Sequence, residues 1–236
     1  MRMRFRDRPS PNHGPRPDGA SVDMLVLHYT GMVSAEAALD RLCDPAAEVS
    51  AHYMVAEDGT VWRLVDEGRR AWHAGRGAWR GISDVNSHSI GVEIVNPGHE
   101  YGYRPFPDAQ MRAVADLCQG ILARHPIPAG NVIAHSDMAP ARKQDPGELF
   151  DWRGLAGAGI GLWPGIAAPG PDWDGSQDHV ARLLARLGYD LGIATFTETL
   201  TAFQRHWHPE ALGQPADAET VRRLRSLLAQ TEQEMA

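Results

Sequence analysis

The sequence has few cysteines, no long apolar run near its start and no excess of positive charge, and each shortage excludes a class of protein. Its two cysteines, Cys43 and Cys118, lack CxxC spacing, which argues against a thiolate metal site and against a disulfide framework. The first apolar run, residues 24–27, is too short for a membrane span or a signal-peptide core. Because the net charge is -7 and the basic residues are scattered, we do not expect a nucleic-acid partner.

What remains is the composition of an ordinary soluble protein with many histidines. Hydrophobic residues make up 43% and charged residues 22% of the chain, so we expect it to fold. Eleven histidines indicate imidazole chemistry. No export signal or membrane anchor is visible, which predicts a cytoplasmic protein if Met1 is the natural start, and a periplasmic one if the start differs. The sequence does not indicate an oligomeric state.

Proline and glycine divide the chain into four parts. Residues 1–21 contain four prolines and no apolar periodicity, which predicts an arm that wraps around the protein or frays. Residues 22–161 are expected to form the main domain, and the proline- and glycine-rich residues 162–175 a linker. Residues 176–236 are expected to form a small three-helix domain. Its helical stretches are 180–187, 197–207 and 217–228.

Strands alternate with helices in the main domain, which predicts an α/β fold with a mixed central sheet flanked by helices. The expected strands are 24–27, 53–56, 61–65, 89–95 and 131–134, and the expected helices are 34–42 and 108–124. The pair Asp58-Gly59 between the second and third strands predicts a tight hairpin. Residues 66–88 have no periodicity, and such a long loop in a compact domain is a candidate substrate wall.

Two histidines, His28 and His135, each stand at the end of a short apolar strand, so their side chains are candidates to meet at one rim of the sheet. Asp145 follows His135 by ten residues, and the Pro-Gly pair after it would let the loop fold back. Two histidines and one aspartate form a zinc set that leaves a fourth position open, as catalytic zinc sites do. The alternative is that each is an ordinary loop or core residue.

Two further residues are candidates for catalysis. Glu93 lies inside an apolar strand, where an unpaired carboxylate is costly to bury, so it is either a general base or a residue on an exposed face of the sheet. Lys143 stands two residues before Asp145 and is either an oxyanion-stabilising cation or a solvated loop lysine. Trp72, His73 and Trp79 in the irregular loop could stack on a sugar or peptide, although tryptophan is more often a packing residue.

Together these residues resemble the zinc-dependent type-2 family of N-acetylmuramoyl-L-alanine amidases, which includes phage-type lysozyme amidases and the peptidoglycan recognition proteins. The resemblance covers residues 22 to about 158 and is carried by five motifs in order. They are LVLHYTG at 25–31, VSAHYMVAEDGTVWRLV at 49–65, AWHAG at 71–75, NSHSIGVEIVN at 86–96 and VIAHSDMAPARKQDPG at 132–147.

The resemblance implies a type-2 amidase fold and a role for each matched residue. It implies one Zn²⁺ per chain, bound by His28, His135 and Asp145, with Glu93 as the catalytic carboxylate and Lys143 as the oxyanion-stabilising cation. The complete zinc set separates the chain from the non-catalytic recognition proteins. We expect the substrate to contact residues within or near these motifs, namely Tyr29, Trp72, His73, Trp79 and Asn86.

The expected reaction is hydrolysis of the amide bond between N-acetylmuramic acid, including its 1,6-anhydro form, and L-alanine of the peptidoglycan stem peptide, in cell-wall recycling or remodelling. The alternatives are a peptidoglycan-binding protein without turnover and a zinc peptidase acting within the stem peptide. Residues 199–228 resemble a small peptidoglycan-binding helical domain, although a three-helix segment is also a common stability module. The expected partner is therefore a muropeptide or peptidoglycan.

Overall fold

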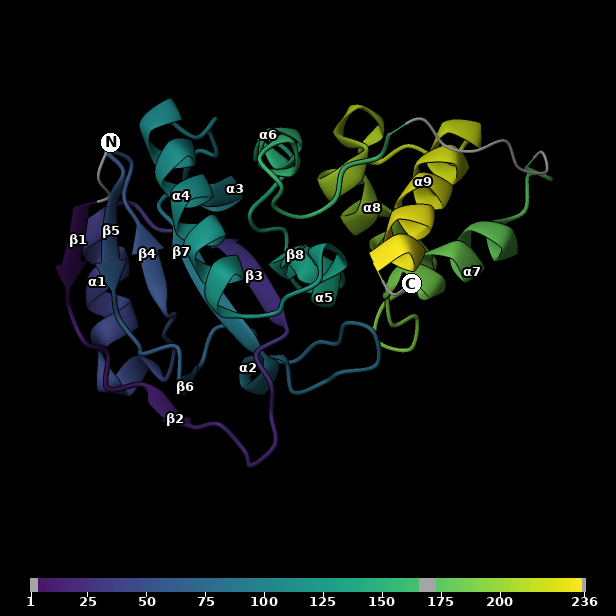
Figure 1. Cartoon of the computed structure of the whole chain (residues 1–236). Helices are drawn as coiled ribbons and strands as arrows, with labels where there is room; N and C mark the ends of the chain where they lie inside the picture. Colours follow the sequence, from purple (N-terminus) through teal and green to yellow (C-terminus); the bar gives the residue numbers. More distant parts are fainter. Residues whose placement is uncertain (1–3, 166–172, 235–236) are drawn as a thin grey trace.

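The computed structural model describes residues 4–165 and 173–234, in which a six-stranded sheet forms the centre of the protein (Figure 1). The strand order is β1-β5-β4-β7-β3-β8. Strands β4, β7, β3 and β8 run parallel to one another, whereas β5 is antiparallel to β4. The predicted mixed sheet is therefore confirmed. Its strands are β1 (Arg4–Asp7), β3 (Met24–Tyr29), β4 (Tyr53–Val55), β5 (Thr60–Arg63), β7 (Ser89–Ile94) and β8 (Val132–Ala134).

Helices flank this sheet and follow it in the chain. Ser34 begins the first helix as predicted, because its side chain accepts a hydrogen bond from the N–H of Ala37. The expected helices 34–42 and 108–124 and the three C-terminal helices are all present. The α-helices are α1 (Ala35–Cys43), α2 (Val85–His88), α3 (Gly98–Tyr101), α4 (Asp108–Arg124), α5 (His135–Met138), α6 (Trp152–Gly157), α7 (Gln177–Leu187), α8 (Phe196–Trp207) and α9 (Ala218–Glu234). Short 3-10 helices lie at Pro45–Ala47, Ala129–Asn131 and Pro209–Ala211.

The predicted hairpin joins β4 to β5, and its turn requires glycine. Gly59 has a φ of 81°, a backbone conformation that L side chains rarely adopt. A Cβ atom there would also approach the carbonyl oxygen of Ala109, in α4, to 2.8 Å. The hairpin turn thus packs directly against the first turn of α4.

The two faces of the sheet are covered differently. Leu25 and Leu27 of β3 point toward α4 and share a buried cluster with its apolar residues. Met24 and Val26 point to the opposite face and share a cluster with residues of α7, α8 and α9. At the other end of that second face, Leu39 and Leu42 of α1 pack on Met54 of β4. Helix α1 thus covers the end of the second face at β4, and the C-terminal helices cover the other end. Figure 1 shows α1 and the C-terminal helices at opposite ends of the sheet.

The N-terminal arm wraps around the main domain and adds regular structure that its composition did not predict. Its first described residues form β1, and residues His13–Pro15 form β2, which pairs with β6 (Arg69–Ala71). The guanidinium group of Arg16 donates hydrogen bonds to the carbonyl oxygens of Glu67, Asn86, Ser87 and Ser89. These bonds hold the arm against the start of β7.

The expectation of an irregular loop over residues 66–88 was partly wrong, because β6 and α2 lie within it. The expected linker, residues 162–175, falls partly outside the described residues. Residues before and after the expected linker belong to one buried cluster. The indole N–H of Trp207 in α8 also donates to the carbonyl of Leu162, the first residue of the expected linker. The division at residues 162–175 into two domains stays a prediction. None of the helices within residues 4–165 and 173–234 is both long and apolar enough to cross a membrane.

Candidate active site

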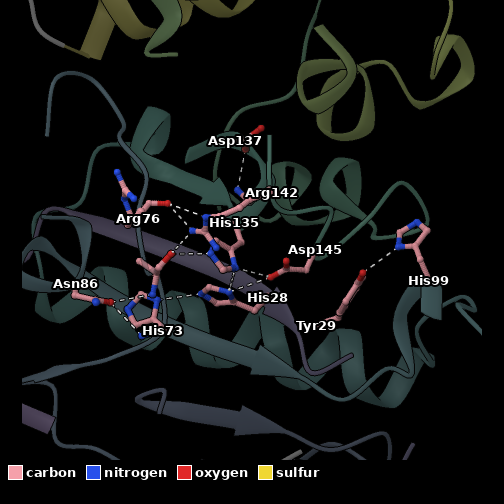
Figure 2. Close-up of polar contacts among 12 residues, drawn as sticks. His28, Tyr29, His73, Arg76, Asn86, His99, His135, Asp137, Arg142 and Asp145 are labelled. Carbon is pink, nitrogen blue, oxygen red and sulfur yellow. Dashed lines mark hydrogen bonds and ion pairs between the residues drawn. The ribbon is translucent and has the colours of Figure 1, made fainter. Parts of the chain in front are cut away.

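Three side chains from three separate segments converge on one point at the edge of the second face. His28 is in β3, His135 begins α5 directly after β8, and Asp145 lies in the loop that follows α5. The two imidazole Nδ1 atoms lie 2.9 Å apart, and Asp145 Oδ2 lies 3.0 Å from Nδ1 of His28 and 2.9 Å from Nδ1 of His135. Figure 2 shows the three side chains pointing toward one another. All three are buried.

Hydrogen bonds on the far side of each imidazole determine which nitrogen faces this point. Nε2 of His135 donates to the carbonyl oxygen of Ala74 at 2.9 Å, and Nε2 of His28 donates to Nδ1 of His73 at 3.0 Å. Both Nδ1 atoms therefore present a lone pair toward Asp145. Two facing lone pairs beside a carboxylate repel one another unless a cation lies between them. The arrangement thus fits a metal ion with two nitrogen ligands and one oxygen ligand.

The electrostatics of the three side chains suit ligands of a cation. Burial, together with the nearby charge of His135, lowers the pKa of His28 to about 4, so its imidazole is neutral at pH 7. Burial alone would raise the pKa of Asp145, but His135 and His28 outweigh burial and hold that pKa below its usual range. A neutral imidazole at His28 and an ionised carboxylate at Asp145 are the protonation states that metal binding requires of these two side chains.

A chain of hydrogen bonds fixes the orientation of His28. The hydroxyl of Ser89 donates to the carbonyl of Val85, so Ser89 Oγ accepts from the Nε2–H of His73 at 3.1 Å. The proton on Nε2 leaves Nδ1 of His73 to accept from Nε2 of His28. Burial lowers the pKa of His73 well below its usual value, which keeps this ring neutral. His73 also lines the pocket beside the site, so its ring supports His28 on one side while its predicted contact with substrate stays a prediction.

Glu93 lies beside the three residues on the same face of the sheet. It is the partner of His28 in the parallel register of β3 and β7, so both side chains point to the same side. Its Oε2 atom is buried and has no hydrogen-bond partner in the described part of the chain. Burial raises the pKa of Glu93 well above its usual value, and the charge of Asp145 raises it further. Such a carboxylate is suited to take up a proton near neutral pH.

A pocket of about 440 Å³ opens beside these residues, between α1 and the loop that holds Asp145. Glu93, Lys143 and the predicted contact residues Tyr29 and Trp72 line it. The positive charge of Lys143 counteracts the rise in the pKa of Glu93, so the ammonium group and the carboxylate interact across the same pocket. The Tyr29 hydroxyl contacts Nδ1 of His99 at 3.0 Å, which fixes its ring at the pocket wall.

Two of the expected substrate contacts, Trp79 and Asn86, do not line this pocket. Trp79 is 0% exposed, and its indole N–H donates to the carbonyl of Gly130 in the core shared with the C-terminal helices. Asn86 is buried, and its Oδ1 accepts hydrogen bonds from the N–H groups of His73 and Ala74. Asn86 therefore shapes the backbone that carries His73 rather than the pocket wall.

Sequence reasoning missed Arg142 and Gly91. The guanidinium group of Arg142 donates to the carbonyls of Ala74 and Arg76, and so fixes the carbonyl that orients His135. Gly91 lies under the ring of His73. A glycine inside a strand indicates close approach of another group and could have given this signal.

Comparison with known proteins identifies the family to which this geometry belongs. A family described as N-acetylmuramoyl-L-alanine amidase matches residues 18–148, more than half of the chain. The chain belongs to this amidase family. It is therefore a hydrolase that cleaves the amide bond between N-acetylmuramic acid and L-alanine, as its motifs predicted.

Individual relatives agree with this assignment. The amidase is 38% identical over 222 residues to N-acetylmuramoyl-L-alanine amidase AmiD of Escherichia coli, covering 84% of this chain and 79% of AmiD. It is 34% identical to 1,6-anhydro-N-acetylmuramyl-L-alanine amidase AmpD of Enterobacter cloacae, over 62% of this chain and 86% of AmpD. The structure of AmpDh3 from Pseudomonas aeruginosa matches with a TM-score of 0.78 and 30% identity, over 95% of this chain and 96% of AmpDh3.

The likeness to AmiD also extends into the C-terminal helices. The structure of E. coli AmiD matches this amidase with a TM-score of 0.79 and 36% identity, over 94% of this chain and 92% of AmiD. The 6% of this chain that the match leaves uncovered is much smaller than the segment that holds α7, α8 and α9. The likeness therefore includes most of that segment, and the predicted type-2 amidase fold followed by three helices is confirmed.

Proposed function

We propose that this amidase binds one zinc ion through Nδ1 of His28, Nδ1 of His135 and a carboxylate oxygen of Asp145. The observation that supports this most directly is the hydrogen bonding of both Nε2 atoms, which leaves both Nδ1 lone pairs facing Asp145. When bound there, zinc acidifies water and polarises the carbonyl of the scissile amide. Three protein ligands leave a position open for this chemistry.

Glu93 is the proposed general base and acid. Its Oε2 has no hydrogen-bond partner among residues 4–165 and 173–234, so a water molecule in the pocket is the natural partner of this carboxylate. Glu93 takes a proton from the water as the water oxygen attacks the lactyl carbonyl. The raised pKa of Glu93 lets its carboxylate hold that proton. It then transfers the proton to the amine nitrogen of the departing L-alanine. One carboxylate thus acts in both halves of the reaction.

Lys143 and the pocket walls have supporting roles in the proposal. The ammonium group of Lys143, which lines the same pocket, stabilises the negative charge that develops on the carbonyl oxygen. Tyr29 and Trp72 present aromatic surface on which the sugar and the first residues of the peptide can pack. Trp79 and Asn86 do not line this pocket.

We propose 1,6-anhydro muropeptides as the substrate class, in cell-wall recycling or remodelling. Two related structures support this choice, because AmiD was found in complex with anhydro-N-acetylmuramic acid-L-Ala-D-gamma-Glu-L-Lys and AmpDh3 with an anhydromuramic pentapeptide. The C-terminal helices are proposed to bind peptidoglycan as well. The expectation of a cytoplasmic location stays a prediction, which fractionation of the full-length protein tests.

Zinc content and substrate preference test this proposal. We expect one zinc ion per chain in the purified protein, and less than a tenth of that in His28→Ala and Asp145→Ala measured by elemental analysis. Rates of peptide release are then compared between a soluble anhydro-muramyl tripeptide and intact peptidoglycan sacculi. A protein without zinc, or one that acts on sacculi alone, would contradict the corresponding part of the proposal.

A further inference from the structure

Two adjacent residues of helix α8 contact the two segments that carry His135 and Asp145. His206 contacts Asp137, which lies two residues after His135, with 2.6 Å between His206 Nδ1 and Asp137 Oδ2. Arg205 contacts Glu148, which lies three residues after Asp145, with 3.4 Å between Arg205 Nε and Glu148 Oε2. One turn of a C-terminal helix therefore connects to both ligand-bearing segments of the main domain.

The contact with Asp137 reaches the backbone at His135. Asp137 is 0% exposed, and its carboxylate accepts three hydrogen bonds. They come from His206 Nδ1, from the Tyr189 hydroxyl at 2.7 Å and from the N–H of Ala134 at 2.8 Å. Ala134 is the last residue of β8, so Asp137 fixes the turn at which His135 enters α5. Two of the three donors come from the segment that follows residue 172.

His206 is itself held in one orientation. Its ring stacks on Trp207 with 3.6 Å between centroids and on Trp152 with 3.7 Å between centroids. Trp152 belongs to α6 of the main domain, so this stack also joins the two parts of the chain. A buried, stacked imidazole has little freedom to rotate. Its N–H therefore presents a fixed donor to Asp137.

The contact with Glu148 reaches the pocket wall. The carboxylate of Glu148 also lies 3.2 Å from Nε2 of His99, and His99 contacts the Tyr29 hydroxyl through Nδ1. The same turn of α8 is thus connected, through Glu148 and His99, to Tyr29. Tyr29 is the chain neighbour of His28, the third member of the site.

We propose that Tyr189 and His206 are positioning residues that hold His135 in its metal-binding geometry through Asp137. The inference rests on the proposed zinc site. It makes the C-terminal helices part of that site, in addition to any wall-binding role. Without the two donors, the buried Asp137 carboxylate loses most of its hydrogen bonds and must move toward water or another donor. Either movement displaces the turn at Ala134 and with it His135.

The test compares zinc affinity among variants of the full-length chain, measured by competition with a chromophoric chelator. Tyr189→Phe and His206→Phe each remove one donor while keeping an aromatic ring in place. We expect their combination to weaken zinc binding by about tenfold or more, as the loss of groups that orient metal ligands does in other proteins. His206→Gln, which retains an N–H donor, should restore part of the affinity relative to His206→Phe.

A matched control on the same helix is Gln204→Met. Gln204 is buried and hydrogen-bonded, but its partners are the backbone groups of Gln214 and Gly213 within the C-terminal segment. We expect Gln204→Met to lower the melting temperature of the zinc-free protein while zinc affinity stays within twofold of wild type. The visible spectrum of the cobalt-substituted protein should change in the double variant and not in this control.

Three outcomes would overturn the inference, and they differ from failure of the proposed function. The first is an unchanged zinc affinity and cobalt spectrum in Tyr189→Phe/His206→Phe. The second is a loss of zinc affinity in Gln204→Met equal to that in the double variant. Either result means that the C-terminal helices only add stability. If the double variant does not fold, the isosteric Tyr189→Phe decides alone, and unchanged zinc affinity there overturns the inference. Absence of zinc binding by the wild-type protein would instead overturn the zinc site itself.

Discussion

The ring of His73 lies directly over Gly91, so close that a Cβ atom at Gly91 would approach the ring carbon Cγ to 2.4 Å. Both residues are buried behind His28, and His73 accepts the hydrogen bond that orients His28. Glycine at position 91 therefore leaves the space that the ring of His73 occupies. This relationship leads to the first prediction.

Gly91→Ala should displace His73 and with it His28, because a distance under 3.0 Å cannot be accommodated without movement. We expect zinc affinity, measured by chelator competition, to fall by about tenfold or more. Gly157→Ala in α6 is the matched control, since a Cβ atom there meets nothing within 4 Å. Zinc binding by Gly91→Ala equal to that of wild type would show that His73 does not orient His28.

His73→Phe keeps a ring over Gly91 but removes the acceptor for Nε2 of His28. The orientation of His28 is then no longer fixed, so zinc affinity should decrease by about tenfold or more. KM measured at saturating zinc should stay within about twofold of wild type, because the hydrogen bond that is lost joins His73 to the far side of the His28 ring. A raised KM with unchanged zinc affinity would instead support His73 as a substrate-binding residue.

Glu93→Gln should retain zinc and lose turnover. The amide has nearly the shape of the carboxylate but cannot accept the proton from water, so we expect kcat to fall by about 10²- to 10⁴-fold. Zinc content, measured on the same preparation, should remain at one ion per chain. Turnover at the wild-type rate would remove Glu93 from the proposed mechanism, and loss of zinc would assign it to the metal site.

Glu67 should stabilise the fold in a pH-dependent way. Burial alone would raise its pKa, but Arg124, His125 and Tyr53 outweigh burial and lower the pKa of Glu67 from 4.5 to about 2. Because the folded protein holds the carboxylate ionised more strongly than the unfolded chain does, this stabilisation is complete above pH 4.5 and is lost as the pH falls toward 2.

Melting temperatures measured between pH 7 and pH 3 for the wild type and Glu67→Gln test this assignment. We expect the variant to melt at a lower temperature at pH 7, and the difference to shrink progressively below the unfolded-state pKa near 4.5. A difference that is constant over this pH range would show that the ion pairs of Glu67 contribute nothing to stability.

The strand pattern made His28 and His135 candidates to meet, because parallel strands place the residues at their ends along the same edge of the sheet. The resemblance to the amidase family, rather than the spacing, selected Asp145 as the third member of the group that the structure brings together. Glu93 was identifiable for a related reason, since a carboxylate inside an apolar strand calls for a partner or a function. Strand and helix positions followed from periodicity, as the agreement at α4 illustrates.

The sequence was not sufficient for residues 66–88, where no periodicity indicates which side chains face the core. Trp79 packs against Tyr189, with 5.1 Å between ring centroids, and this contact joins segments more than 100 residues apart. Its burial therefore depends on where the C-terminal helices pack. The proline- and glycine-rich composition of residues 162–175 predicted a boundary, but it carries no information on the apolar face of α7 that packs against the second face of the sheet.

The most direct test of the account is identification of the products formed from a 1,6-anhydro-muramyl tripeptide by mass spectrometry, with the enzyme as purified, after metal removal by a chelator, and after zinc is added back. We predict release of the intact tripeptide with a free L-alanine amino group, loss of this product after metal removal, and its recovery with zinc. Cleavage within the peptide, or undiminished release from metal-free protein, would contradict the account.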